Sequence, residues 1–292
     1  HIIAPHRVQG MNCYCEGILP SLIIKPKPKR SAAPLFDPIV TVVVLITIGL
    51  GAGTLGSMLG VGGGIIMVPA LTVMGLPPAQ IASTSLFAVT STSVSSTIEY
   101  SRQKRIDYRV GMQMAGLAIP GAVIGAVLSD YLSPESFRLY FGVLLMITGL
   151  YILYKNSILR EGKDATKKRP LLLSATLGAS FGAGVISSLF GVGGGGIFMP
   201  IMLLILGMTM HRAAPTSHLI LMVSSVAGVL AHVFLGHPDY LQALALSAGA
   251  FVGGQIGSRL SKSTRELILH RLLGLVLIGV GAKFIFDWFS AR

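Results

Sequence analysis

Leu59-Gly60-Val61-Gly62-Gly63-Gly64 returns later in the chain as Phe190-Gly191-Val192-Gly193-Gly194-Gly195. Each copy lies in apolar sequence and is followed five residues later by a proline, Pro69 or Pro200. The two copies begin 131 positions apart, and the sequence that follows them also repeats at nearly this offset. The recurrence predicts a chain built from two homologous repeats.

The composition around these motifs is that of a membrane protein. Of the 292 residues, 52% are hydrophobic and only 12% are charged, against about 25% charged in soluble domains. A helix needs about 20 residues to cross the hydrocarbon layer, and its backbone polar groups must be paired within the segment. The sequence therefore predicts an all-α polytopic protein of the cytoplasmic (inner) membrane, with about four transmembrane helices in each repeat. Eight segments qualify: 39–59, 81–100, 110–128, 137–154, 171–190, 215–235, 241–260 and 269–288.

The apolar runs after the glycines, 65–76 and 197–207, are about half as long as a crossing at about 1.5 Å per residue. We interpret them as re-entrant half-helices, which favours four crossings per repeat with the N-terminus in the cytoplasm. Five crossings per repeat would instead invert the second half, and would place the run Lys25 to Arg30 outside. The distribution of Lys and Arg does not decide between these arrangements.

Four regions follow from this pattern: an extended tail (1–36), a first transmembrane repeat (37–155), a basic linker (156–169) and a second repeat (170–292). The net charge of +12 comes from Lys and Arg between apolar segments, which indicates orientation in a membrane rather than nucleic-acid binding. The only cysteines, Cys13 and Cys15, are too few for a disulfide framework or a metal site. We expect no metal and no cofactor, and the first long apolar segment should be retained.

Glycine-rich backbone inside a membrane is tolerated only where protein or water surrounds it, so the two glycine runs predict an internal cavity. A helix that begins after such a break presents free N–H groups, which can bind an anion. Helix packing is the alternative explanation for single glycines, and it is our interpretation of Gly121, Gly125, Gly253 and Gly257. The candidate substrate-binding glycines are Gly60, Gly62, Gly63, Gly64, Gly191, Gly193, Gly194 and Gly195.

A second polar cluster follows each glycine run, at Thr84 and Ser85 and again at Thr216 and Ser217. These hydroxyls can donate hydrogen bonds to an anion, or they can bond to carbonyls of their own helix. His218 follows the second pair directly, and it can carry a proton during transport or pack as a neutral side chain. Glu99, which borders a basic loop, is expected to form an interfacial ion pair.

Other chemistries have little support in the sequence. The run from Gly191 to Gly196 formally matches a dinucleotide fingerprint, but the flanking strand and the acidic residue about 20 positions on are both missing. No pair of carboxylates lies in the crossings, and no hydrolase motif is present. We therefore do not expect an enzyme.

The twin GVGGG runs with Pro69 and Pro200, together with the two Thr-Ser pairs, resemble the TauE/SafE family of anion transporters. The resemblance covers roughly 38–288. It implies a permease that moves sulfite or organosulfonate-type anions by alternating access between two repeats. The residues alone support only a small oxyanion in a lipid bilayer, and they allow a homo-oligomer. A glycine-lined anion channel, and a membrane-embedded partner or sensor without transport, stay open as alternatives.

Overall fold

The structure is a computed structural model that describes residues 38–156 and 170–290. These residues form ten α-helices and one short 3₁₀ helix, with no strand in either range, so the predicted all-α class is confirmed. The expected tail (1–36), with its two cysteines, lies outside the described residues, as does the expected linker apart from Asn156.

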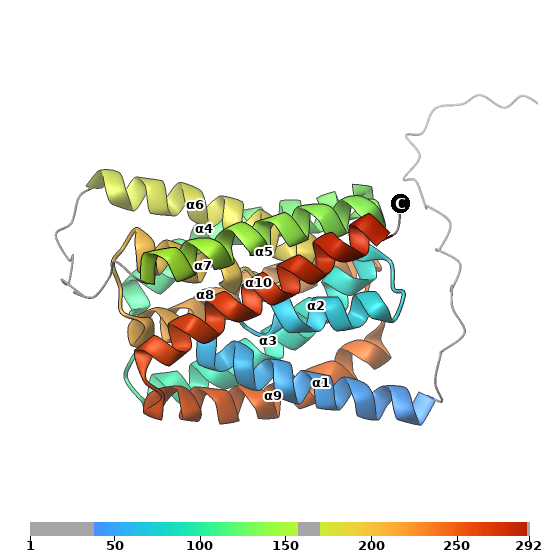
Figure 1. The fold of residues 1–292 in the computed structure, drawn as a ribbon, viewed down its shortest axis with the longest axis horizontal. Helices are drawn as coiled ribbons and strands as arrows, with labels where there is room; N and C mark the ends of the chain where they lie inside the picture. Colours follow the sequence, from blue (N-terminus) through green and yellow to red (C-terminus); the bar gives the residue numbers. More distant parts are fainter. Residues whose placement is uncertain (1–37, 157–169, 291–292) are drawn as a thin grey trace, which may run out of the picture. The chain divides into compact units, whose positions relative to one another are not determined.

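The helices follow the predicted segments closely (Figure 1). Each of the eight predicted crossings overlaps a helix of 21 to 25 residues, while the runs after the glycines form two helices of 10 residues. The helices are α1 (Pro38–Leu59), α2 (Gly64–Val73), α3 (Pro78–Arg102), α4 (Tyr108–Leu128), α5 (Pro134–Asn156), α6 (Pro170–Phe190), α7 (Gly195–Leu204), α8 (Met210–Phe234), α9 (Tyr240–Ser263) and α10 (Glu266–Ser290), with the 3₁₀ helix η1 (Ser129–Tyr131) after α4.

Three stretches of the described chain are long and apolar enough to span a membrane: Ile39–Leu59, Tyr108–Tyr131 and Met210–Phe234. Large apolar side chains on α1 and α4, such as Val43 and Val127, are exposed and suited to contact lipid. The protein is therefore an integral membrane protein. Helix α3 is the least apolar of the predicted crossings in the described chain, because it is rich in Ser and Thr.

Helices α3 and α8 run antiparallel to each other. The Thr90 hydroxyl donates to Ser225 Oγ at 2.9 Å near their centres. The ring of Tyr100, near the end of α3, lies 5.8 Å from the ring of His218, near the start of α8. Helices α5 and α10 are also antiparallel, because Gly142 faces Gly281 whereas Gly149 faces Leu277.

The antiparallel directions of these two helix pairs contradict the predicted topology of four crossings per repeat. With four crossings per repeat, the loops near 129–135 and 236–240 would lie on opposite sides of the membrane. In the structure Asp130 Oδ1 lies 2.8 Å from His237 Nε2, so both loops lie at one end, the Asp130 end. The Arg105 guanidinium donates to the His211 carbonyl at 3.0 Å at the other end, the Arg105 end. The short helix α2 turns the chain back before α3 begins, and a count of full-length segments misses this reversal.

Aspartates cap two of the helices at their N-termini. The Val110 amide donates to Asp107 Oδ1 at 3.2 Å at the start of α4, and the Gln242 amide donates to Asp239 Oδ1 at 3.4 Å at the start of α9. The backbone amide of Asp107 also donates to Thr216 Oγ1 at 3.0 Å, which ties α4 to α8.

Replacing Asp107 with Ala should destabilise the protein by about 1 kcal/mol, because the cap is lost. We expect the apparent unfolding temperature in detergent to fall by about 2–4 °C. Asp107→Asn is the matched control, since an asparagine oxygen also accepts from the helix amides. An equal loss in both variants would mean that the charge of Asp107, rather than the cap, stabilises α4.

Candidate functional site

The first glycine segment (60–64) joins α1 to α2, and the second glycine segment (191–195) joins α6 to α7. The two segments touch. A Cβ atom added to Gly64 would lie 2.6 Å from the Val192 carbonyl oxygen, and one added to Gly195 would lie 2.6 Å from the Val61 carbonyl oxygen. No other residue type fits these two positions without moving the backbone, so the glycines allow the segments to meet.

Most of these glycines also have a backbone conformation that side chains disfavour. Positive φ angles of 74° to 83° occur at Gly60, Gly62, Gly63, Gly191, Gly193 and Gly194. A residue with a Cβ atom would cost about 1–2 kcal/mol at each of these positions. The need for glycine is therefore both conformational and steric.

Ser85 and Ser217 cross-link the two segments to the opposite half of the chain. Ser85 Oγ, on α3, donates to the carbonyl of Gly191 at 2.7 Å, and Ser217 Oγ, on α8, donates to the carbonyl of Gly60. Each hydroxyl also lies within hydrogen-bond distance of a carbonyl in its own helix, that of Ala82 or Ala214. Since a hydroxyl has one proton to donate, both serines hold glycine carbonyls in this conformation rather than offering a donor to an anion.

The two predicted threonines differ in their contacts. Thr216 Oγ1 donates to the Arg212 carbonyl at 2.8 Å and accepts from the amide of Asp107. Thr84 Oγ1 is completely buried and has no hydrogen-bond partner among the described residues. Thr84 therefore offers an unused donor and acceptor, whereas Thr216 ties two helices together.

His218 is completely buried in the first half of α8, beside Tyr100. Neither ring nitrogen makes a hydrogen bond to a described residue, although the carbonyl groups of Gly56 and Ser57 lie near enough to act on the ring. The Tyr100 hydroxyl donates to the carbonyl of Ser57 at 2.8 Å. His218 is thus close to the start of the first glycine segment but is not bonded to it.

Backbone donors stay unused where α2 and α7 begin. In α2 the first backbone amides that donate a hydrogen bond are those of Ile66 and Met67, and both donate to the Gly63 carbonyl. In α7 they are those of Ile197 and Phe198, and both donate to the Gly194 carbonyl. The amides of Gly64 and Gly195, which precede them, donate no hydrogen bond within the described ranges. Free amides at a helix N-terminus suit an anion.

A buried hydroxyl that was not predicted from the sequence lies next to the first glycine segment. Val89 contacts both Gly62 and Gly193, and one turn further along α3 the Ser93 hydroxyl lies 3.8 Å from the position of a Cβ atom on Gly62. Ser93 and Thr97 are buried, and their hydroxyls have no described partner. The signal was their spacing, because Val89, Ser93 and Thr97 are four residues apart and share one face of the helix.

The space beside the second glycine segment is small. A cavity of about 10 Å³ lies between Ser187, Val192 and Gly194, which is enough for about one water molecule. Its remaining lining residues include Phe141, Leu145 and Ile197. No group of His, Cys, Asp and Glu side chains suited to a metal ion occurs in the described part of the chain. The space beside the second glycine segment is therefore nearly closed in this conformation.

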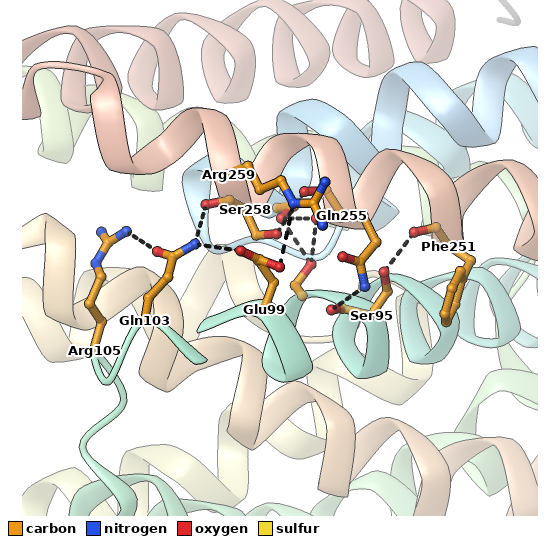
Figure 2. Close-up of polar contacts among 11 residues, drawn as sticks. Ser95, Glu99, Gln103, Arg105, Phe251, Gln255, Ser258 and Arg259 are labelled. Atoms are coloured by element: carbon orange, nitrogen blue, oxygen red, sulfur yellow. Dashed lines mark hydrogen bonds and ion pairs between the residues drawn. The ribbon is translucent and has the colours of Figure 1, made fainter. Parts of the chain in front are cut away.

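A polar network joins α3 to α9 toward the Arg105 end (Figure 2). Arg259 Nε lies 3.4 Å from Glu99 Oε2, and Gln103 Nε2 donates to Glu99 Oε1 at 3.3 Å. The expected ion pair of Glu99 is thus formed with Arg259, whose side chain is exposed whereas that of Glu99 is mostly buried. Arg105 donates to Gln103 Oε1 at 3.0 Å, and burial lowers the pKa of its guanidinium from the ordinary value.

Comparison with known proteins gives consistent results. The family described as Sulfite exporter TauE/SafE matches residues 45–284. The probable membrane transporter protein YunE of Bacillus subtilis is 32% identical over 266 residues, which cover 84% of this chain and 97% of that protein. The probable membrane transporter protein YfcA of Escherichia coli K12 is 25% identical over 244 residues, covering 84% and 89% of the two chains. No solved structure matches.

Proposed function

We propose, since the chain belongs to the TauE/SafE sulfite exporter family, that it is a secondary transporter of small anions of the sulfite or organosulfonate class. The family makes it a membrane transporter. The observation that carries the proposal for an anion is the meeting of two glycine segments whose helix-starting amides are unused. Amide donors recognise an oxyanion without placing a fixed cation in the membrane.

The proposed architecture is a pair of inverted repeats, 37–155 and 170–292, each with one broken segment. The antiparallel pairs α3–α8 and α5–α10 support it, as do the crossed bonds from Ser85 and Ser217. Inverted repeats that meet at broken helices are a common design of secondary transporters.

The charges of the loops support a multi-pass orientation in the cytoplasmic membrane. Lys104 and Arg105, in the α3–α4 loop, lie at the Arg105 end together with Arg212 and Arg265. The loops 74–77, 129–133 and 236–239 contain neither Lys nor Arg. Because positive loops stay in the cytoplasm, we assign the Arg105 end to the cytoplasmic side.

The proposed mechanism is alternating access. In the closed arrangement the segments contact each other, and Ser85 and Ser217 hold their carbonyls. Rocking of the halves would separate the segments, so that the amides of Gly64 and Gly195 and the hydroxyls of Thr84 and Ser93 could reach an anion. Ion coupling is part of the proposal; the sequence leaves His218 open either as a proton carrier or as a neutral packed side chain.

A flux assay in proteoliposomes tests this function. Radiolabelled sulfite, sulfoacetate and sulfate are offered separately, and we expect saturable uptake of sulfite or sulfoacetate that is trans-stimulated by unlabelled anion. Large, non-saturating anion currents would instead identify a channel. Absence of flux for every anion would favour a membrane-embedded partner or sensor.

Thr84→Val gives a local test of the anion site. The two side chains have similar shapes, and removal of an unsatisfied hydroxyl costs no hydrogen bond in the closed protein. We expect the thermal stability to hold while the half-saturation concentration for the anion rises about tenfold. Thr216→Val is the matched comparison, because it breaks the bond to Asp107 and should lower stability. Unchanged half-saturation in Thr84→Val would remove Thr84 from the site.

A further inference from the structure

A chain of three polar contacts leads from the Asp130 end into the interior of the protein. Asp130 Oδ1 lies 2.8 Å from His237 Nε2, and the Nδ1 atoms of His237 and His232 lie 2.9 Å apart. His232 Nε2 lies 3.2 Å from the carbonyl oxygen of Ser188. The residues come from η1, the α8–α9 loop, α8 and α6.

The exposed fraction of the side chains falls steadily along this series of contacts. The Asp130 side chain is 30% exposed and that of His237 is 11% exposed, whereas His232 and Ser188 are completely buried. Ser188 lies three positions before Gly191, and the amide of Val192 donates to the carbonyl of the neighbouring Ser187. The contacts therefore connect the protein surface with the base of the second glycine segment.

The number of protons in these contacts is informative. The two groups at the ends of this series of contacts, the Asp130 carboxylate and the Ser188 carbonyl, can only accept hydrogen bonds. The two imidazoles lie between them. Three hydrogen bonds need three protons, but two neutral imidazoles carry only two. The arrangement is complete when one further proton is bound, either on an imidazole or on the carboxyl group of Asp130.

Among the described residues, His237 and Asp130 are the groups whose charges act on His232. Helix α6 has no ionisable side chain, and α4 has none after Arg109. The ionisable residues of α3, Glu99, Tyr100 and Arg102, lie at the opposite end of that helix.

We propose that Asp130, His237 and His232 form the proton-binding site that couples transport to a proton gradient. This inference rests on the proposed anion transport. A proton that enters at Asp130 is taken up by His237 at Nε2, and His237 gives a proton from Nδ1 to Nδ1 of His232, whose Nε2–H donates to the Ser188 carbonyl. Without the added proton, two protons serve three contacts, and the His232 tautomer that bonds His237 leaves the Ser188 carbonyl without its donor, so protonation changes how tightly α6 is held beside the second glycine segment. The two states of that contact link proton binding to the movement of the halves.

The test separates coupling from transport in proteoliposomes. Radiolabelled sulfoacetate is the probe, because its sulfonate stays ionised between about pH 6 and 8, where a histidine titrates. Counterflow at equal pH measures anion exchange, and accumulation driven by a pH gradient measures coupling. A pH-sensitive dye inside the vesicles reports proton movement.

We expect Asp130→Asn and His232→Gln to lower gradient-driven accumulation about tenfold or more, with counterflow within about twofold of the unmodified protein. The dye should show anion movement without proton movement in both variants. Asp239→Asn is the matched control, because it removes a carboxylate at the same end and keeps a helix cap. Asp130 is partly exposed, so Asp130→Asn still tests the proposal if the buried His232→Gln variant misfolds.

Several results would overturn the assignment. Accumulation retained in Asp130→Asn would do so, as would a parallel loss of counterflow and accumulation, or uncoupling by His218→Gln with no effect of Asp130→Asn. Counterflow without any response to a pH gradient in the unmodified protein would refute the proton site and leave the proposed transport intact. Absence of counterflow for sulfite as well as sulfoacetate would refute the proposed transport itself.

Discussion

Gly191→Ala is expected to abolish transport, although it adds a single methyl group. The new Cβ atom would lie 2.2 Å from Ser85 Oγ and 2.5 Å from the Cα atom of Ala82. It would also lie on a residue with a φ angle of 74°. The backbone strain costs about 1–2 kcal/mol, and forcing α3 away from the second glycine segment adds about 1–3 kcal/mol.

Gly75→Ala is the matched control for this prediction. Gly75 has a φ angle of 77°, but nothing lies within 4 Å of its added Cβ atom. The Gly75→Ala variant should therefore have the backbone strain without the clash, and it should still transport the anion. Counterflow and thermal unfolding are measured for both variants after extraction in detergent. Equal activity in the two variants would show that contact between Ser85 and the second glycine segment is not needed for transport.

Gly253→Val is the second change with a large expected effect, and it acts on assembly rather than on the site. A Cβ atom on Gly253 would lie 2.3 Å from the carbonyl oxygen of Leu50, so the backbones of α9 and α1 are in direct contact. Gly249 and Gly257 meet Ile46 and Thr54 of α1 in the same way. Small residues at this spacing allow membrane helices to approach closely.

We expect the larger side chain to separate α1 from α9 and to destabilise the protein by about 3 kcal/mol or more. The measurement is the fraction of protein that stays monodisperse after extraction, together with its unfolding temperature. Gly51→Val is the control, because Gly51 lies on α1 with nothing within 4 Å of an added Cβ atom. If both variants were equally stable, close packing of α1 on α9 would not be what holds this helix pair together.

The positions of the helices could be predicted from the sequence because apolar runs and glycine breaks mark their ends directly. Helix α1 begins one residue before the predicted segment and ends at the same residue, Leu59. The direction of the second half could not be predicted, because it depends on how α2 turns the chain between two full-length helices. The numbers of Lys and Arg in the loops did not distinguish four crossings per repeat from five.

The candidate site was predictable only in part. The two glycine segments could be found in the sequence, because their positive φ angles exclude most residues other than glycine. The bond partners of Ser85 and Ser217 were not predictable, since they lie 106 and 157 residues away in the chain. The same holds for His232, whose contacts require η1 and the loop after α8 to come together in space.

The pairing of α1 with α9 affects how the protein can be made. Ile46 and Gly249, which touch in the folded protein, are 203 residues apart in the sequence. At a synthesis rate of about 5–20 residues per second, α1 leaves the ribosome roughly 10–40 seconds before its partner exists. During that interval the face of α1 that later contacts three glycines of α9 has no helix to cover it. The nascent chain therefore depends on lipid or on the insertion machinery to cover this face, and a chain stalled before α9 should be a substrate for membrane quality control.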